Sequence, residues 1–166
     1  MGTPSRPRFD RLEPSCPDYA RLPVAAAFTW DACTSERDAG EWYLVAFRSQ
    51  LRPGADCDRL HAYDDRAHEE AARSPGFVHY FKGPVTDLGD CLSFCVWTSR
   101  AEARAASGGP AHREAIGIAH GTYERYTLEF IRLTKRLGAS TFEFEPYDAA
   151  PAMVTTSRRR PLLAAT

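Results

Sequence analysis

Apolar and polar positions change their spacing several times along the middle of the chain. Alternating runs rich in aromatic and β-branched residues predict five strands, at 41–50, 77–81, 91–97, 126–135 and 141–145. Apolar residues spaced three to four apart predict helices at about 56–73, 99–106 and 111–120. The order strand, helix, strand, strand, helix, strand indicates a small α+β sandwich.

Proline and glycine mark where these elements end. Ser74-Pro75-Gly76 closes the first long helix, because a residue before proline is driven out of the α region and glycine suits the chain reversal. Thr98 or Ser99 begins the next helix, with Glu102 placed as a capping box requires. The turn chemistry therefore agrees with the periodicity.

The two ends of the chain differ from its middle. Residues 1–22 are rich in proline, arginine and aspartate with few apolar anchors, which predicts a flexible N-terminal arm. By the same criterion residues 149–166 form a disordered C-terminal tail. The folded domain is expected over residues 23–148.

Composition narrows the class of protein. The chain has 166 residues, of which 43% are hydrophobic and 26% charged, as in an ordinary single soluble domain. A net charge of −1 offers no general attraction to nucleic acid or anionic membrane. No apolar run reaches the roughly 20 residues of a membrane span, and no secretory signal is visible. We expect a cytoplasmic protein with neither nucleic acid nor membrane as a partner.

Neither the cysteine spacing nor the common cofactor motifs point to a binding site in this chain. The five cysteines include no CxxC pair, so neither a disulfide framework nor a cysteine metal site is expected. The chain contains no GxGxxG or Walker loop for a dinucleotide or nucleotide, and no HExxH motif. The sequence requires no cofactor.

Several junctions together resemble a known family. These are Arg66-Ala67-His68 with Ser74-Pro75-Gly76-Phe77, then Val96-Trp97-Thr98-Ser99, then Pro110-Ala111-His112. They resemble the antibiotic-biosynthesis monooxygenase (ABM) group of the dimeric α+β barrel superfamily, over roughly residues 42–134. The resemblance implies a ferredoxin-like βαββαβ protomer with an antiparallel sheet. It also implies a homodimer in which two sheets meet face to face, and a pocket between each sheet and its helices.

The same resemblance leaves the chemistry open. Family activities include cofactor-free oxygenation of aromatic polyketides, heme binding and oxidative heme breakdown. Heme-degrading members place an asparagine on the first strand, where this chain has Ala46, Phe47 and Arg48. Their axial histidine aligns with Ala115, and His112 lies three residues earlier. If heme binds, His112 or His79 is the axial candidate; no other metal is expected.

Three residues are candidates for catalysis. His79 lies on a strand between Phe77 and Phe81, on the face that those two side chains are predicted to share. It is either a polar group in an aromatic pocket or a core histidine bonded to a carbonyl. His112 is either a proton acceptor or a solvated first-turn residue. Arg48, within an apolar strand, either reaches the edge of the sheet or anchors an anion.

The predicted strands carry many aromatic residues, which either fill the core or line a site for a flat ligand. Candidate substrate-binding residues are Phe47, Phe77, Tyr80, Phe81, Phe94 and Trp97. The leading hypothesis is a small oxygenase without a nucleotide cofactor. It would act on an electron-rich aromatic or polyketide-like molecule, with His79 or His112 taking a proton and Arg48, Tyr80 or Trp97 stabilising the anion. The alternatives are a heme-binding barrel and a non-enzymatic module that binds a hydrophobic small molecule.

Overall fold

The central part of the chain forms one antiparallel sheet with helices on one face. The computed structural model describes residues 5–147 and 152–155. In chain order the central elements are β1 (Gly40–Leu51), α2 (Cys57–Ala72), β2 (Phe77–Phe81), β3 (Asp90–Trp97), α3 (Arg100–Ser107), α4 (Pro110–Thr122) and β4 (Tyr123–Lys135). The strand order β2-β3-β1-β4 is that of a ferredoxin-like βαββαβ unit, as expected. Within the described residues no helix is long and apolar enough to cross a bilayer.

The predicted helix boundaries are reproduced by local hydrogen bonds. Asp56 caps α2 by accepting a bond from the Arg59 backbone amide at 2.9 Å. Gly76 takes a positive φ of 76°, which permits the sharp reversal into β2. Ser99 and Glu102 form the expected capping box, because the Glu102 amide donates to Ser99 Oγ and Ser99 Oγ donates back to the Glu102 carboxylate.

Two further strands extend the sheet along β4. β5 (Glu143–Pro146) pairs with residues 131–134 of β4, and β6 (Ala152–Thr155) pairs with residues 125–128. β6 therefore lies within the segment expected to be a disordered tail, 149–166. It forms because β4 is long enough to offer unpaired backbone groups to a second partner strand. The rest of that tail, 149–151 and 156–166, lies outside the described residues.

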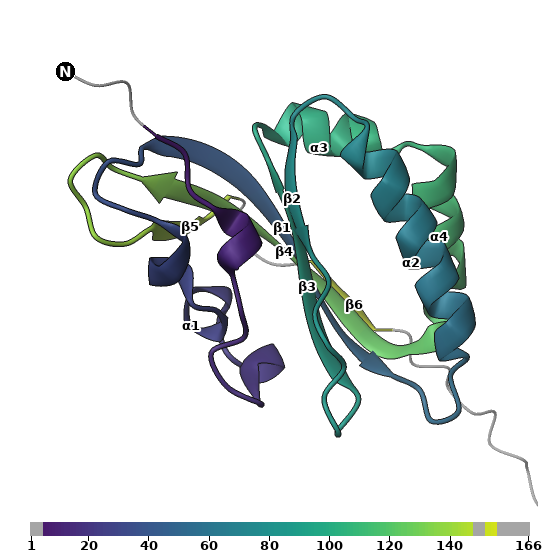
Figure 1. The fold of residues 1–166 in the computed structure, drawn as a ribbon. Coiled ribbons are helices and arrows are strands. Elements are labelled where there is room, and N and C mark those ends of the chain that lie inside the picture. The colour runs from purple at the N-terminus through teal and green to yellow at the C-terminus, as the bar shows by residue number, and fades with distance from the viewer. Residues whose placement is uncertain (1–4, 148–151, 156–166) are drawn as a thin grey trace, which may run out of the picture.

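The N-terminal segment is packed, unlike the flexible arm expected over residues 1–22. Residues 5–39, which we call the arm, contain η1 (Phe9–Arg11), η2 (Tyr19–Arg21), α1 (Val24–Ala27) and η3 (Trp30–Cys33). The arm crosses the sheet on the face opposite α2, α3 and α4 (Figure 1). Its few apolar side chains were too sparse to form a periodic pattern, yet all of its Phe, Tyr and Trp side chains are buried.

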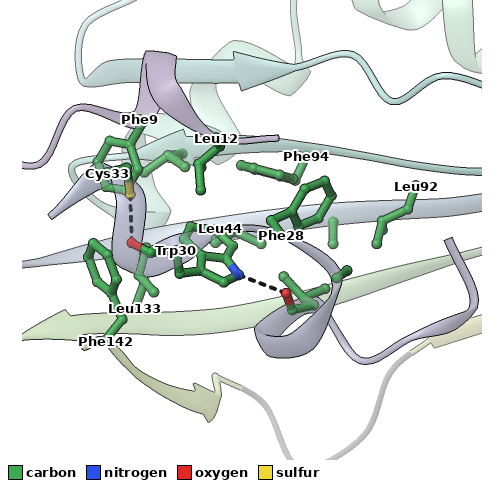
Figure 2. Packing of buried hydrophobic residues seen from close by; sticks show 14 of the residues in the cluster. Phe9, Leu12, Phe28, Trp30, Cys33, Leu44, Leu92, Phe94, Leu133 and Phe142 are labelled. Carbon is green, nitrogen blue, oxygen red and sulfur yellow. Dashed lines mark hydrogen bonds between the residues drawn. The ribbon is translucent and has the colours of Figure 1, made fainter. Parts of the chain in front are cut away.

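The arm and the sheet share one hydrophobic cluster, the arm-side core. The arm contributes Phe9, Leu12, Tyr19, Phe28 and Trp30, each at most 5% exposed. In Figure 2 Trp30 lies among Leu44, Leu133 and Phe28, with its indole nitrogen directed toward a backbone carbonyl. That bond runs from Trp30 Nε1 to the Val24 oxygen at 2.9 Å. The ring is therefore buried among apolar side chains, and its nitrogen has a hydrogen-bond acceptor within the protein.

Polar contacts also attach the arm to the sheet. Arg48 Nε pairs with Glu129 at 2.8 Å, and its terminal nitrogens donate to the backbone oxygens of Ala20 and Leu22. Tyr19 donates to the Pro84 oxygen at 2.7 Å. These bonds join the arm to β1 and to the loop between β2 and β3, which holds it in one position.

The opposite layer is formed by the three helices. Every buried residue of α2, α3 and α4 is an alanine, and none of the three helices contributes a large buried side chain. The sheet presents a second cluster toward them that includes Tyr43, Trp97 and, partly buried, Phe130. The layer between sheet and helices thus pairs aromatic rings with methyl groups.

Glu70 links two of these helices. Its carboxylate oxygens accept bonds from the backbone amides of Ala111 and His112 at 3.1 and 3.2 Å, at the N-terminus of α4. The residue before this helix, Gly109, has no side chain that could accept these bonds.

Glu70→Ala is therefore expected to lower the free energy of unfolding by about 1 kcal/mol in urea denaturation, because two helix amides lose their acceptor. Glu69→Ala is the matched control, since its exposed ion pair with Arg73 is worth little. Equal effects of the two changes would contradict the capping role.

Candidate functional site

The sheet divides the candidate residues into two groups that do not meet. Phe47, Phe77, Tyr80 and Trp97 lie on the face toward the helices, which we call the helix side. His79, Phe81 and Phe94 lie on the arm side with Arg48. The single site expected from sequence, with His79, Arg48 and all six aromatic candidates around one ligand, is therefore not assembled.

A register shift in β2 separates Phe77 from the two residues expected to share its face. Phe77 pairs with Trp97 and His79 with the next residue, Val96, so the strand bulges between them. As a result Phe77 contacts Trp97 on the helix side, while Val78 joins the arm-side core. His79 and Phe81 share a face as predicted, but Phe77 does not.

His79 is a packed residue of the arm side. Its ring lies 6.4 Å from the ring of Phe9 and 6.5 Å from that of Phe94. Burial lowers its pKa below the usual value, which favours the neutral imidazole. A ligand held between the sheet and the helices would not reach it.

Arg48 is occupied by the arm rather than by a ligand anion. Its guanidinium binds Glu129 and the carbonyls of Ala20 and Leu22, as described above. The sequence had left open whether this arginine reaches an edge or anchors an anion. The structure shows a third use, the attachment of an N-terminal segment that sequence periodicity did not reveal.

The helix-side face of the sheet is only partly covered. Six of its apolar or aromatic residues keep some accessible surface: Val45, Phe47, Phe77, Tyr80, Cys95 and Phe130. Opposite this face the buried helix residues are the alanines described above.

A polar cluster lies at the β2 end of this face. Tyr80 donates a hydrogen bond of 2.7 Å to Asp64 Oδ1 on α2. The other carboxylate oxygen, Asp64 Oδ2, is 3.1 Å from Lys82 Nζ, and Lys82 also contacts Asp65 at 2.7 Å. Burial first, and then the Asp64 carboxylate, raises the pKa of Tyr80 well above its usual value, so the phenol remains a donor at neutral pH.

Tyr123 on β4 lies on the same face, with its ring 5.2 Å from that of Phe47, and burial raises the pKa of its phenol. The sequence had indicated Tyr80 but not Asp64, Lys82 or Tyr123. One signal was available for Asp64: it lies four residues before His68 on α2, so the two share a helix face.

The remaining histidine candidates lie on the helices. The His68 ring is 4.9 Å from the ring of Tyr80 and 5.8 Å from that of Phe77. Its Nδ1 is buried and has no hydrogen-bond partner among the described residues. His112 lies in the first turn of α4, where burial lowers its pKa despite the nearby Glu70 carboxylate.

Of the two axial candidates for a heme in the sheet–helix layer, only His112 lies on the side of the helices. His79 is on the opposite face of the sheet, and Ala115 stands at the position that the family resemblance assigns to the axial ligand. Among the described residues no group of three or more histidine, cysteine, aspartate or glutamate side chains could hold a metal ion.

A cavity of about 390 Å³ lies elsewhere, between the arm and the β2–β3 loop. It is lined by Pro14, Cys16, Pro17, Tyr19, Pro84, Val85 and Thr86. None of the candidate catalytic or substrate-binding residues belongs to this lining. We therefore place the candidate site in the sheet–helix layer, where polar groups and partly exposed aromatic rings occur together.

Solved structures similar to this chain include SnoaB, a cofactor-independent oxygenase from Streptomyces nogalater. It is 21% identical with a TM-score of 0.45, over 59% of this chain and 95% of that chain. Rv0793 from Mycobacterium tuberculosis is 20% identical with a TM-score of 0.48, over 57% of this chain and 95% of that chain.

A curated relative and a family model match the chain by sequence. The UPF0643 protein PB2B2.08 of Schizosaccharomyces pombe is 34% identical over 144 residues, which cover 76% of this chain and 66% of that protein. The matched part thus spans 66% of the relative's length. The model described as PB2B2.08-like matches residues 7–146, a range that includes most of the arm as well as the ferredoxin-like unit. The chain therefore belongs to the PB2B2.08-like family.

Proposed function

We propose that this protein binds a flat, electron-rich aromatic molecule in its sheet–helix layer and oxidises it with O2, without a nucleotide cofactor. The observation that carries the binding step is the mismatch between the two sides of the layer. Partly exposed aromatic and apolar side chains on the sheet face helices whose buried residues are all alanines. Flat apolar ligands with a few polar groups suit such a surface.

The oxidation step rests on the ABM resemblance of the helix–SPGF–strand and strand–Trp–Thr–Ser–helix junctions. In such chemistry the substrate loses a proton and its electron-rich anion reduces O2 directly. The protein must then bind the substrate, accept a proton and exclude bulk water. The helix side provides groups for the first two of these tasks: Phe47, Phe77 and Trp97 for binding, and the Tyr80–Asp64 pair for the proton.

The direct test uses dithranol, a dihydroxyanthrone, in an oxygen electrode. The expected result is enzyme-dependent uptake of one O2 per dithranol, giving dantron (the corresponding anthraquinone) and water. Hydrogen peroxide should not accumulate. Uptake no faster than in the protein-free buffer, with no binding of dithranol, would contradict the proposal. Binding without uptake would instead support a non-enzymatic ligand-binding module.

A volume change tests whether the layer has room for such a ligand. Val45→Phe is expected to reduce dithranol oxidation more than tenfold while shifting Tm by only a few degrees, because the added ring occupies ligand space. If side chains already fill the layer, the extra volume should instead cost about 1–3 kcal/mol of stability. Val85→Phe, at a loop position that is 43% exposed, is the matched control and should leave both quantities unchanged.

A further inference from the structure

Tyr80, Asp64 and Lys82 form a continuous polar chain from the sheet to the protein surface. Tyr80 donates to Asp64 at 2.7 Å, and Asp64 in turn lies 3.1 Å from the Lys82 ammonium. Side-chain exposure rises along this chain, from 31% for Asp64 to 41% for Lys82 and 65% for Asp65. The inner end is therefore enclosed and the outer end is in contact with water.

The direction of the hydrogen bonds defines what the inner end can do. Because the Tyr80 hydroxyl gives its proton to Asp64, its oxygen acts as an acceptor toward other groups, of which the Ser93 hydroxyl is one. Asp64, the acceptor of this bond, is also paired with the Lys82 ammonium at 3.1 Å. The arrangement suits an acidic hydroxyl as the donor to Tyr80.

The surrounding rings hold Tyr80 in this orientation. His68 packs on the Tyr80 ring, at 4.9 Å between centroids, and it also contacts Phe77. Its Nδ1 is buried and has no partner among the residues that the structure describes. The His68 ring therefore supports the Tyr80 ring from the side of α2.

We propose that Tyr80 and Asp64 are a proton relay that accepts the proton of a phenolic hydroxyl on an aromatic ligand bound in the sheet–helix layer. This inference rests on the proposed function and names the ligand class, a hydroxylated aromatic, together with its proton acceptor. In the step, the ligand O–H bond breaks and its proton goes to Tyr80 Oη. The Tyr80 proton moves to Asp64 Oδ1 at the same time, which leaves a phenolate and a neutral carboxyl group. Asp64 then returns the proton to water beside Lys82.

The relay predicts a separation between binding and turnover. Tyr80→Phe is expected to lower kcat for dithranol by about a hundredfold or more, while KM changes less than tenfold. Asp64→Asn should lower kcat similarly with little effect on KM, and Asp64→Glu should restore part of the activity. Tyr63→Phe is the matched control, because Tyr63 lies on the same helix but contacts the guanidinium groups of Arg59 and Arg66.

A binding measurement that needs no turnover distinguishes failure of the relay from failure of the oxygenase function. The probes are dantron, which carries the phenolic hydroxyls but is already oxidised, and anthraquinone, which lacks them. Tyr80→Phe is expected to weaken dantron binding about fivefold and to leave anthraquinone binding unchanged.

Each outcome of this pair of assays is decisive. If wild type and Tyr80→Phe bind dantron equally well, the relay is overturned even where dithranol is oxidised. If the variant weakens dantron binding but wild type does not oxidise dithranol, the phenol contact is supported and the oxygenase function is overturned. If the wild-type protein binds neither probe, both proposals are overturned.

Discussion

Trp30→Ala is expected to lower the free energy of unfolding by about 3–5 kcal/mol, the cost of removing a large buried aromatic ring. Trp30 is 3% exposed and contacts the rings of Phe28, Phe94, Phe142 and Phe144. It belongs to the arm, yet three of these four partners lie outside the arm. The loss should therefore destabilise the whole domain and not only the N-terminal segment.

Urea denaturation followed by far-UV circular dichroism measures this effect, because it does not depend on the tryptophan that is removed. Leu137→Ala is the control, at a position that is 67% exposed, and should change stability by less than about 0.5 kcal/mol. A loss below about 1 kcal/mol for Trp30→Ala would mean that the arm unfolds independently of the sheet.

Static light scattering is expected to give the full chain the molar mass of a monomer, 18.5 kDa. One face of its sheet lies against α2, α3 and α4, and the other is covered by the arm (Figure 1). The face-to-face dimer implied by the ABM resemblance needs an apolar sheet surface on the side away from the helices. In this chain Phe9, Phe28 and Trp30 already occupy that surface, so a second sheet would have to displace them.

Removal of residues 1–39 provides the complementary experiment. The deletion would expose Trp42, Leu44, Phe94 and Leu133, which are at most 6% exposed in the full chain. We expect the truncated protein to self-associate or aggregate, because association would bury this contiguous apolar surface away from water. The full-length protein could instead have twice the monomer mass while its arm stays protected from proteolysis. That result would show that two copies associate without using this face of the sheet.

Much of the ferredoxin-like unit could be predicted because its determinants are local. Alternation along β1 and β3, the cap at Ser99 and the turn at Gly76 each depend on residues close together in the chain. The candidate site was only partly predictable. Tyr80 and Trp97 were identified as aromatic residues of strands, but Asp64 becomes relevant only through its contact with a residue 16 positions away.

Three features depended on contacts that no local pattern carries. The bulge between Phe77 and His79 shifts the register of β2 and places these two side chains on opposite faces. Arg48 meets carbonyl groups 26 and 28 residues before it, which turns a candidate ligand anchor into an attachment point. The arm is stable because several isolated apolar residues are buried together, although none forms a periodic run.

The sequence alone determined the order of strands and helices, the turn chemistry and the abundance of aromatic residues on the strands. These follow from backbone preferences and from spacing over a few residues. Only the tertiary structure decided which aromatic rings face the helices, what covers the other side of the sheet, and where the Tyr80–Asp64–Lys82 chain runs. The physical reason is that a strand's side chains alternate between two faces, and long-range packing determines what each face meets.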